Sequence, residues 1–228
     1  MQLHLIDDVP FEPNLGEIAE QIRLDAYPEL EEQVRDLCRR CQDVARPKAV
    51  YRIVTVDDTA GDRVSMDGQS FRSEALGENL RDSERVIAYV ATCGTEIAGL
   101  DLSGYDPLSE YWHSILKERA LRAVTARLYE AVEHEHGFAD LSQMNPGSAN
   151  YDVWPIAQQR PLFALFGGAT DDIGVRLTES HLMVPDKSVS GVMFTSTTGY
   201  VNCHACDREN CPNRRAPFLG PRVPAQER

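Results

Sequence analysis

The sequence predicts an α+β fold, a single domain in which a largely antiparallel, twisted sheet packs against one long helix. The strongest helical pattern covers residues 107–137, where apolar side chains recur at the spacing of one helix face. Runs rich in β-branched and aromatic residues predict strands at 49–57, 85–92 and 189–196. Helices and strands do not alternate regularly, which disfavours a parallel sheet built from βαβ units.

Two helices are expected before the first of these strands. One begins near Asn14, and a second covers residues 27–47 and ends at Pro47. Free cysteine behaves in a protein core as a small apolar residue, so Cys38 and Cys41 are expected to pack inside rather than to bind a metal. They share the apolar stripe of this helix with Leu30, Val34, Leu37 and Val44.

Turn signals divide the rest of the chain. Asp67 and Gly68 predict a hairpin within residues 63–71, and Pro146 and Gly147 predict a turn in a loop that begins at Gln143. The remaining expected elements are a helical turn at 73–80, a helix at 156–168 and a strand at 173–178.

Two histidines, His134 and His136, flank Glu135 at the expected end of the long helix. This spacing resembles a metal clip, but cations are also favoured near the carbonyl end of a helix dipole. The simpler interpretation is a solvated helix end, with Gly137 as the helix cap.

The composition limits the classes of function. The chain has 228 residues, a hydrophobic fraction of 42% and a formal charge of −13. A core of ordinary size is therefore expected, and the negative charge argues against nucleic acid or an anionic membrane as a partner. The first residues lack the features of a signal peptide, and no apolar run is long enough to cross a membrane. We therefore expect a cytoplasmic protein, whose cysteines are free or metal-bound rather than paired.

Three cysteines gather near the end of the chain. Cys203, Cys206 and Cys211 form the pattern Cys-x2-Cys-x4-Cys, which fits a structural zinc site or an iron–sulfur cluster. Three thiolates do not complete either site. Cys93 is our predicted fourth ligand, because it follows a predicted strand that turns toward the surface, and His204 is the alternative.

A sequence motif in residues 173–194 carries a resemblance to a known family. The pattern LTES-x-x-M-x-P-x-x-SVSG is represented by Leu177, Thr178, Glu179, Ser180, Met183, Pro185, Ser188, Val189, Ser190 and Gly191. This segment resembles the activation domain of cobalamin-dependent methionine synthase. The order of the elements before it also fits, so residues 1–200 are expected to form this domain. Residues 201–228 would then be a cysteine-rich tail packed on the same domain.

The resemblance implies a function. Activation domains of this family bind S-adenosylmethionine and present it to a corrinoid whose cobalt has been oxidised to Co(II). An electron donor reduces the cobalt, and the methyl group traps the reduced form. The resemblance therefore implies a stand-alone accessory protein that acts on a corrinoid-binding protein or cobalamin-dependent methyltransferase. An iron–sulfur cluster of the four-iron type is favoured over zinc, because such a cluster can relay a low-potential electron.

The resemblance also implies ligand-binding positions. The family uses an Arg-x-x-x-Gly-Tyr loop and a tyrosine beyond the SVSG strand, which Tyr200 matches. Gln143 stands in place of the arginine and Ser148 in place of the loop tyrosine, for which Tyr151 is a substitute. A neutral glutamine cannot form the bidentate, charge-assisted pair that arginine forms with a carboxylate. The candidate ligand-binding residues are Gln143, Pro146, Gly147, Ser148, Tyr151 and Tyr200.

A second interpretation follows from these departures. The chain would be a non-catalytic binding module that keeps the fold, docks a corrinoid or methyltransferase partner and holds a structural zinc. No Ser/His/Asp arrangement, phosphate-binding loop or dinucleotide motif is present, so the sequence predicts no catalytic residue.

Overall fold

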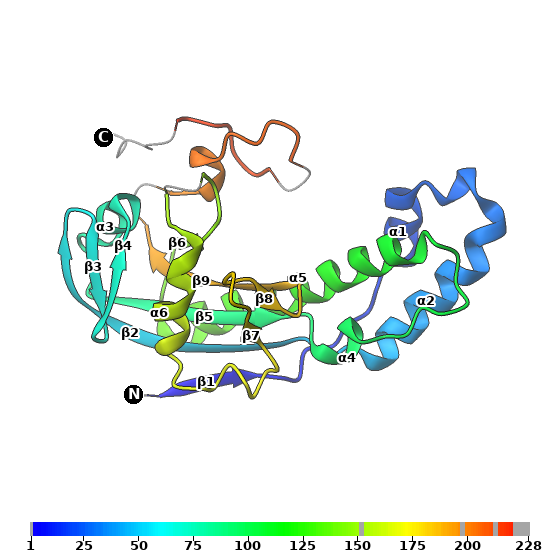
Figure 1. Ribbon diagram of the computed structural model, residues 1–228, viewed down its shortest axis with the longest axis horizontal. Helices are drawn as coiled ribbons and strands as arrows, with labels where there is room; N and C mark the ends of the chain where they lie inside the picture. The colour runs from blue at the N-terminus through cyan, green and yellow to red at the C-terminus, as the bar shows by residue number, and fades with distance from the viewer. Residues whose placement is uncertain (1, 151–152, 197–198, 212–213, 221–228) are drawn as a thin grey trace.

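A computed structural model describes residues 2–150, 153–196, 199–211 and 214–220. Every strand pairing in these residues is antiparallel. The main sheet has the order β4-β3-β2-β5-β9-β6, and β1 pairs with the outer side of β2 (Figure 1). The strands of the main sheet are β1 (Leu3–Ile6), β2 (Lys48–Ala60), β3 (Arg63–Met66), β4 (Gln69–Arg72), β5 (Arg85–Thr92), β6 (Leu141–Met144) and β9 (Ser188–Thr195). A separate small hairpin joins β7 (Arg176–Leu177) to β8 (Met183–Val184).

The centre of the sheet buries both of its faces. Side chains alternate between the two faces of a strand, so neighbouring residues of β2, β5 and β9 enter different core clusters. One cluster contains Val54, Val90 and Phe194, and packs against α6 (Gln159–Ala164). The cluster on the other face contains Tyr51 and Tyr89, and packs against α5 (Ser109–His136). This burial on both faces explains the nearly continuous apolar run of β5.

The long helix α5 joins the sheet to a helical region (Figure 1). Its first half packs with α1 (Leu15–Ile22) and α2 (Glu31–Val44) through Trp112 and Leu116. Its second half covers the sheet through Val124 and Leu128. Gly137 ends the helix in the left-handed conformation, with φ of 69°, and its N–H donates to the Glu133 carbonyl. The other described helices are α3 (Glu74–Leu80) and α4 (Thr95–Ala98).

The helical region buries Cys38 and Cys41, as their position on the apolar stripe predicts. Both thiols lie in the core cluster shared by α1, α2 and α5. Burial raises the pKa of Cys38 to about 11 and that of Cys41 to about 12. Thiols that stay protonated are poor metal ligands and nucleophiles, so these two cysteines act as core side chains.

The predicted fold class is confirmed, and the differences lie at the edges of the sheet. β1 and β6 were not expected, because short edge strands carry no alternation long enough to recognise. Gln143, expected in a loop, lies in β6 opposite Met193. The strand expected at 173–178 shrinks to the two residues of β7. None of the helices in the described ranges has the length and apolar character needed to span a membrane.

Candidate functional site

Five of the six predicted ligand-binding residues lie in the described part of the chain, in β6, in the turn that follows it and in the segment after β9. Gln143 lies in β6, and its Oε1 accepts hydrogen bonds from Tyr89 (3.1 Å) and Tyr129 (2.8 Å). Burial raises the pKa of Tyr129 to about 12, so the hydroxyl remains a donor at neutral pH. The amide oxygen of Gln143 is therefore held by two tyrosines from β5 and α5.

Asn145 extends this arrangement toward the C-terminal segment. Its Nδ2 donates to the Tyr89 hydroxyl at 2.7 Å and to the Ser190 carbonyl at 2.8 Å. Its Oδ1 accepts from the Nδ2 of Asn202 at 2.8 Å. We call Tyr89, Tyr129, Gln143, Asn145 and Asn202 the tyrosine–amide network. It joins β5, α5, β6 and the segment after β9 through side chains alone.

The sequence predicted only Gln143 of this network. Asn145 directly precedes the Pro-Gly turn, and asparagine beside a turn was the available signal. Tyr89 was expected only as part of a buried strand and Tyr129 only as part of the long helix, because sequence periodicity does not show where a hydroxyl finds its partner. Asn202 carried no signal of its own.

The Pro-Gly turn lies at one end of the network. Gly147 has φ of 81°, which L side chains rarely adopt, and its N–H donates to the Trp154 carbonyl at 2.7 Å. Pro146 is buried, and the Ser148 N–H donates to the Asn145 carbonyl at 3.1 Å. The turn is thus fixed by backbone bonds on both sides. Tyr151 lies outside the described residues.

Tyr200 is buried, with 5% of its surface exposed, and it packs in the same core cluster as Met144 and Trp154. Its hydroxyl has no hydrogen-bond partner among the described residues. Burial raises the pKa of Tyr200 to about 12, so this hydroxyl is neutral and able to donate. An unsatisfied buried hydroxyl costs about 1–3 kcal/mol, and a bound polar group would remove that cost.

The cysteine loop, residues 203–211, begins in the short 3-10 helix Asn202–Ala205. All three of its thiols are free and half-buried. Arg214 crosses the loop and donates to the carbonyls of Cys206 (3.2 Å), Ala216 (3.1 Å) and Arg208. The backbone N–H of Arg215 donates to the Cys203 sulfur at 3.3 Å. Hydrogen bonds from the Arg214 guanidinium to backbone carbonyls are therefore the main contacts that hold the loop.

Cys93, the predicted fourth metal ligand, is fully buried among residues of α2 and α5, in a different core cluster from Ala205 of the cysteine loop. It lies two residues before α4, and α4 and the segment after β9 lie on different sides of the molecule (Figure 1). Burial raises the pKa of Cys93 to about 12. The strand before it ends under the helical region, so the turn that follows points into a core instead of toward solvent.

The cysteine loop does not form a closed metal site either. In the described part of the chain, its three sulfurs are not a set of ligand atoms lying within 4.8 Å of one another. A structural zinc site and a four-iron cluster held by four cysteines both require four converging protein donors. Thiolates are suitable ligands for a thiophilic metal, but three sulfurs in these positions do not complete such a site.

Arg215 adds positive charge beside the network. Burial raises the pKa of Tyr129 and of Tyr89, and the Arg215 guanidinium opposes this effect at both hydroxyls. The cation therefore lies close enough to act on the two tyrosines that hold Gln143. Its own side chain is exposed, so it remains available to an anionic ligand.

The comparisons with known proteins concern this same region. Residues 146–215 match the family described as the vitamin B12 dependent methionine synthase, activation domain. The chain resembles that activation domain. The matched segment contains the Pro-Gly turn, β9, Tyr200 and the cysteine loop. No curated protein matches the sequence.

Solved structures support the resemblance at the level of the fold. The crystal structure of the MetH reactivation domain bound to AdoHcy superposes with a TM-score of 0.59. The match covers 86% of this chain and 79% of that domain, at 15% sequence identity. The α+β fold with its antiparallel sheet and long helix is therefore that of an activation domain.

Proposed function

We propose that this chain takes part in the reactivation of a corrinoid-bearing partner and binds S-adenosylmethionine beside Tyr200 and the tyrosine–amide network. The observation that carries the proposal is the buried Tyr200 hydroxyl, which has no partner in the part of the chain that the structure describes. It lies within the segment that matches the activation-domain family. The chain also shares its fold with a domain whose crystal structure contains AdoHcy.

Each part of the site has a role in this proposal. The Pro-Gly turn shapes one side of the pocket, Gly191 lets β6 pack closely on β9, and the Tyr200 hydroxyl donates to a polar group of the ligand. Gln143 cannot pair with a carboxylate as arginine does, and its Oε1 is already bonded. Arg215 supplies the missing cation in this proposal, because its positive charge acts on both tyrosines that hold Gln143.

In the proposed reaction, an external donor reduces the partner's cobalt, and the methyl group of S-adenosylmethionine traps the reduced form. The residues of this chain bind and orient the methyl donor, and no proton transfer is assigned to them. The proposal includes a cytoplasmic location, which is supported by six free cysteines.

No step is assigned to a metal at the cysteine loop, since its sulfurs do not converge. Iron, sulfide and zinc analysis of protein purified without oxygen tests whether the loop closes around a metal. About four irons per chain would indicate a cluster, and one zinc would indicate a structural site.

A second candidate is a binding module that docks the partner without S-adenosylmethionine. One observation favours it. Gln143 stands at the position of the family's arginine, and its Oε1 already accepts hydrogen bonds from Tyr89 and Tyr129. This candidate requires partner binding but no ligand affinity.

The two candidates separate in three measurements on the full-length protein. Isothermal titration with S-adenosylmethionine and with AdoHcy tests ligand binding, co-sedimentation with a corrinoid protein tests association, and a Co(II) reactivation assay with that protein and a reductant tests function. Binding together with faster reactivation supports the proposal. Association with the corrinoid protein without ligand binding supports the binding module, and loss of all three rejects both.

A further inference from the structure

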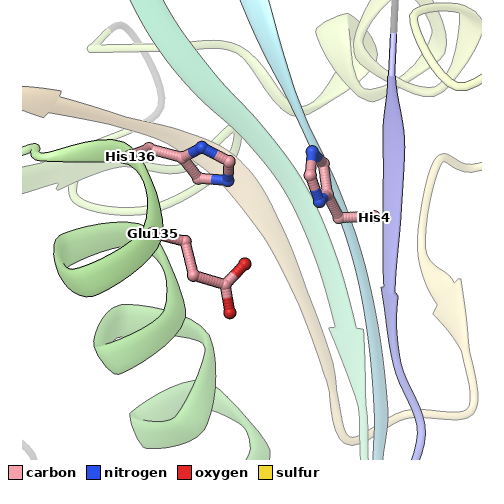
Figure 2. A group of neighbouring side chains, drawn as sticks. All are labelled: His4, Glu135 and His136. Atoms are coloured by element: carbon pink, nitrogen blue, oxygen red, sulfur yellow. The ribbon is translucent and has the colours of Figure 1, made fainter.

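A second group of potential ligands lies away from the tyrosine–amide network. His4 on β1 faces Glu135 and His136 at the end of α5, and one ligand atom from each lies within 4.8 Å of the others (Figure 2). The two imidazole rings are 4.9 Å apart between centroids and nearly perpendicular, at 76°. Residues from opposite parts of the chain thus direct two imidazoles and a carboxylate toward one point.

The sheet register places these groups together. His4 pairs with Tyr51 across β1 and β2, so the two side chains project from the same face and their rings stack at 4.7 Å. The C-terminal end of α5 covers that face. The Tyr51 hydroxyl lies 3.4 Å from Glu135 Oε2 and 3.3 Å from His136 Nε2. Tyr51 is 1% exposed, so it is a fixed support beneath the group.

We propose that His4, Glu135 and His136 bind a divalent transition-metal ion, with Zn²⁺ the preferred species, and thereby fasten β1 to the end of α5. Two imidazoles and one carboxylate suit zinc better than magnesium or calcium, which prefer oxygen ligands. Three protein ligands leave a fourth zinc position open to water or to another ligand.

The three ligand atoms need to move only a short distance toward one another to bind zinc. Zinc–ligand bonds of roughly 2.0–2.1 Å place tetrahedral donors about 3.4 Å apart, so the present spacing of up to 4.8 Å closes by side-chain rotation. Tyr51 contacts both α5 ligands and would orient them, as partners of metal ligands commonly do.

A helix dipole explains only part of this arrangement. It accounts for His134 and His136 in the last turn of α5, but it gives no reason for His4 to approach from β1. His134 is exposed and lies outside the group. It therefore provides a matched control on the same helix end.

The test uses untagged, chelator-treated protein that carries Cys203→Ser, Cys206→Ser and Cys211→Ser, so that these half-buried thiols do not compete for zinc. Titration with ZnCl₂ is expected to show one site per chain and a zinc-dependent rise in Tm. His4→Phe keeps a ring on Tyr51 but removes the nitrogen ligands, and Glu135→Gln removes the carboxylate. Each is expected to weaken zinc binding by about tenfold or more, whereas His134→Ala leaves it unchanged.

The inference is overturned if the parent protein binds no zinc, or if His4→Phe and Glu135→Gln bind it as tightly as the parent. Equal losses in His134→Ala and His4→Phe would also overturn it, because they would indicate diffuse binding at the helix end. None of these outcomes depends on S-adenosylmethionine or on a corrinoid partner.

Discussion

Gly191 and Asn145 lie so close that a methyl group on the glycine would come within 2.6 Å of the Asn145 Nδ2. The same added carbon would lie 2.2 Å from the Met144 carbonyl oxygen. No other residue fits at this point of β9 while β6 remains paired to it. Close packing therefore explains the glycine of the SVSG motif. Without a side chain at this position, Asn145 can reach the Ser190 carbonyl and the Tyr89 hydroxyl.

Gly191→Ala should therefore displace the end of β6 and the tyrosine–amide network. We expect a loss of about 1–3 kcal/mol in the free energy of unfolding, typical of overpacking, measured by urea denaturation. Gly16→Ala in α1 is the control, because its nearest neighbour would be the Asn14 side chain at 3.3 Å and alanine favours a helix. Equal stabilities of the two variants would contradict this account of Gly191.

Tyr200→Phe removes a buried hydroxyl that has no partner in the described residues. The ligand-free protein should keep its stability or gain up to about 1 kcal/mol, since no hydrogen bond is lost. If the hydroxyl binds the ligand, affinity for S-adenosylmethionine should fall about tenfold, the effect of about one hydrogen bond. Thermal denaturation and isothermal titration measure the two effects. Lower stability with unchanged affinity would show that the hydroxyl is structural.

Arg215→Ala should weaken S-adenosylmethionine binding by about tenfold or more, because it removes a charge-assisted contact to the carboxylate. Arg215→Lys keeps the charge but not the planar fork, so its loss should be smaller. Arg208→Ala is the control, since this residue contributes its carbonyl to Arg214 through the backbone. Isothermal titration at two salt concentrations measures these affinities. Identical binding by all three variants would exclude Arg215 from the site.

His113 should make stability depend on pH. Burial lowers its pKa below the ordinary value of 6.5, and its Nε2 lies 2.7 Å from the Ile97 carbonyl. Lys117, Glu110 and Asp186 also act on it. The unfolded chain therefore binds a proton more readily than the folded one. This contribution is fully present above about pH 6.5 and is lost as the pH falls through the folded pKa.

The measurement is urea denaturation of the wild type and of His113→Gln between pH 8 and pH 5. The wild type should lose more stability over the acidic part of this range than the variant, which carries no titrating group at that position. Parallel pH profiles for the two proteins would contradict the assignment.

The sequence by itself determined the class of fold and much of the local structure. Helix stripes, β-branched runs and the Asp67-Gly68 turn encode contacts between residues a few positions apart, so they are readable along the chain. The turn forms as predicted, with positive φ at both residues. Cys38 and Cys41 are also buried, because their places on a helix stripe decide which face they occupy.

Only the tertiary structure decided which distant residues meet. Cys93 was expected beside the cysteine loop but lies in the helical core, because the packing of α2 and α5 covers the end of β5. His4 meets Glu135 and His136 through the strand register, and the return path of the chain brings the positive charge of Arg215 to act on Tyr129. Such contacts depend on how whole helices and strands pack together, and the local periodicity of the sequence does not predict that packing.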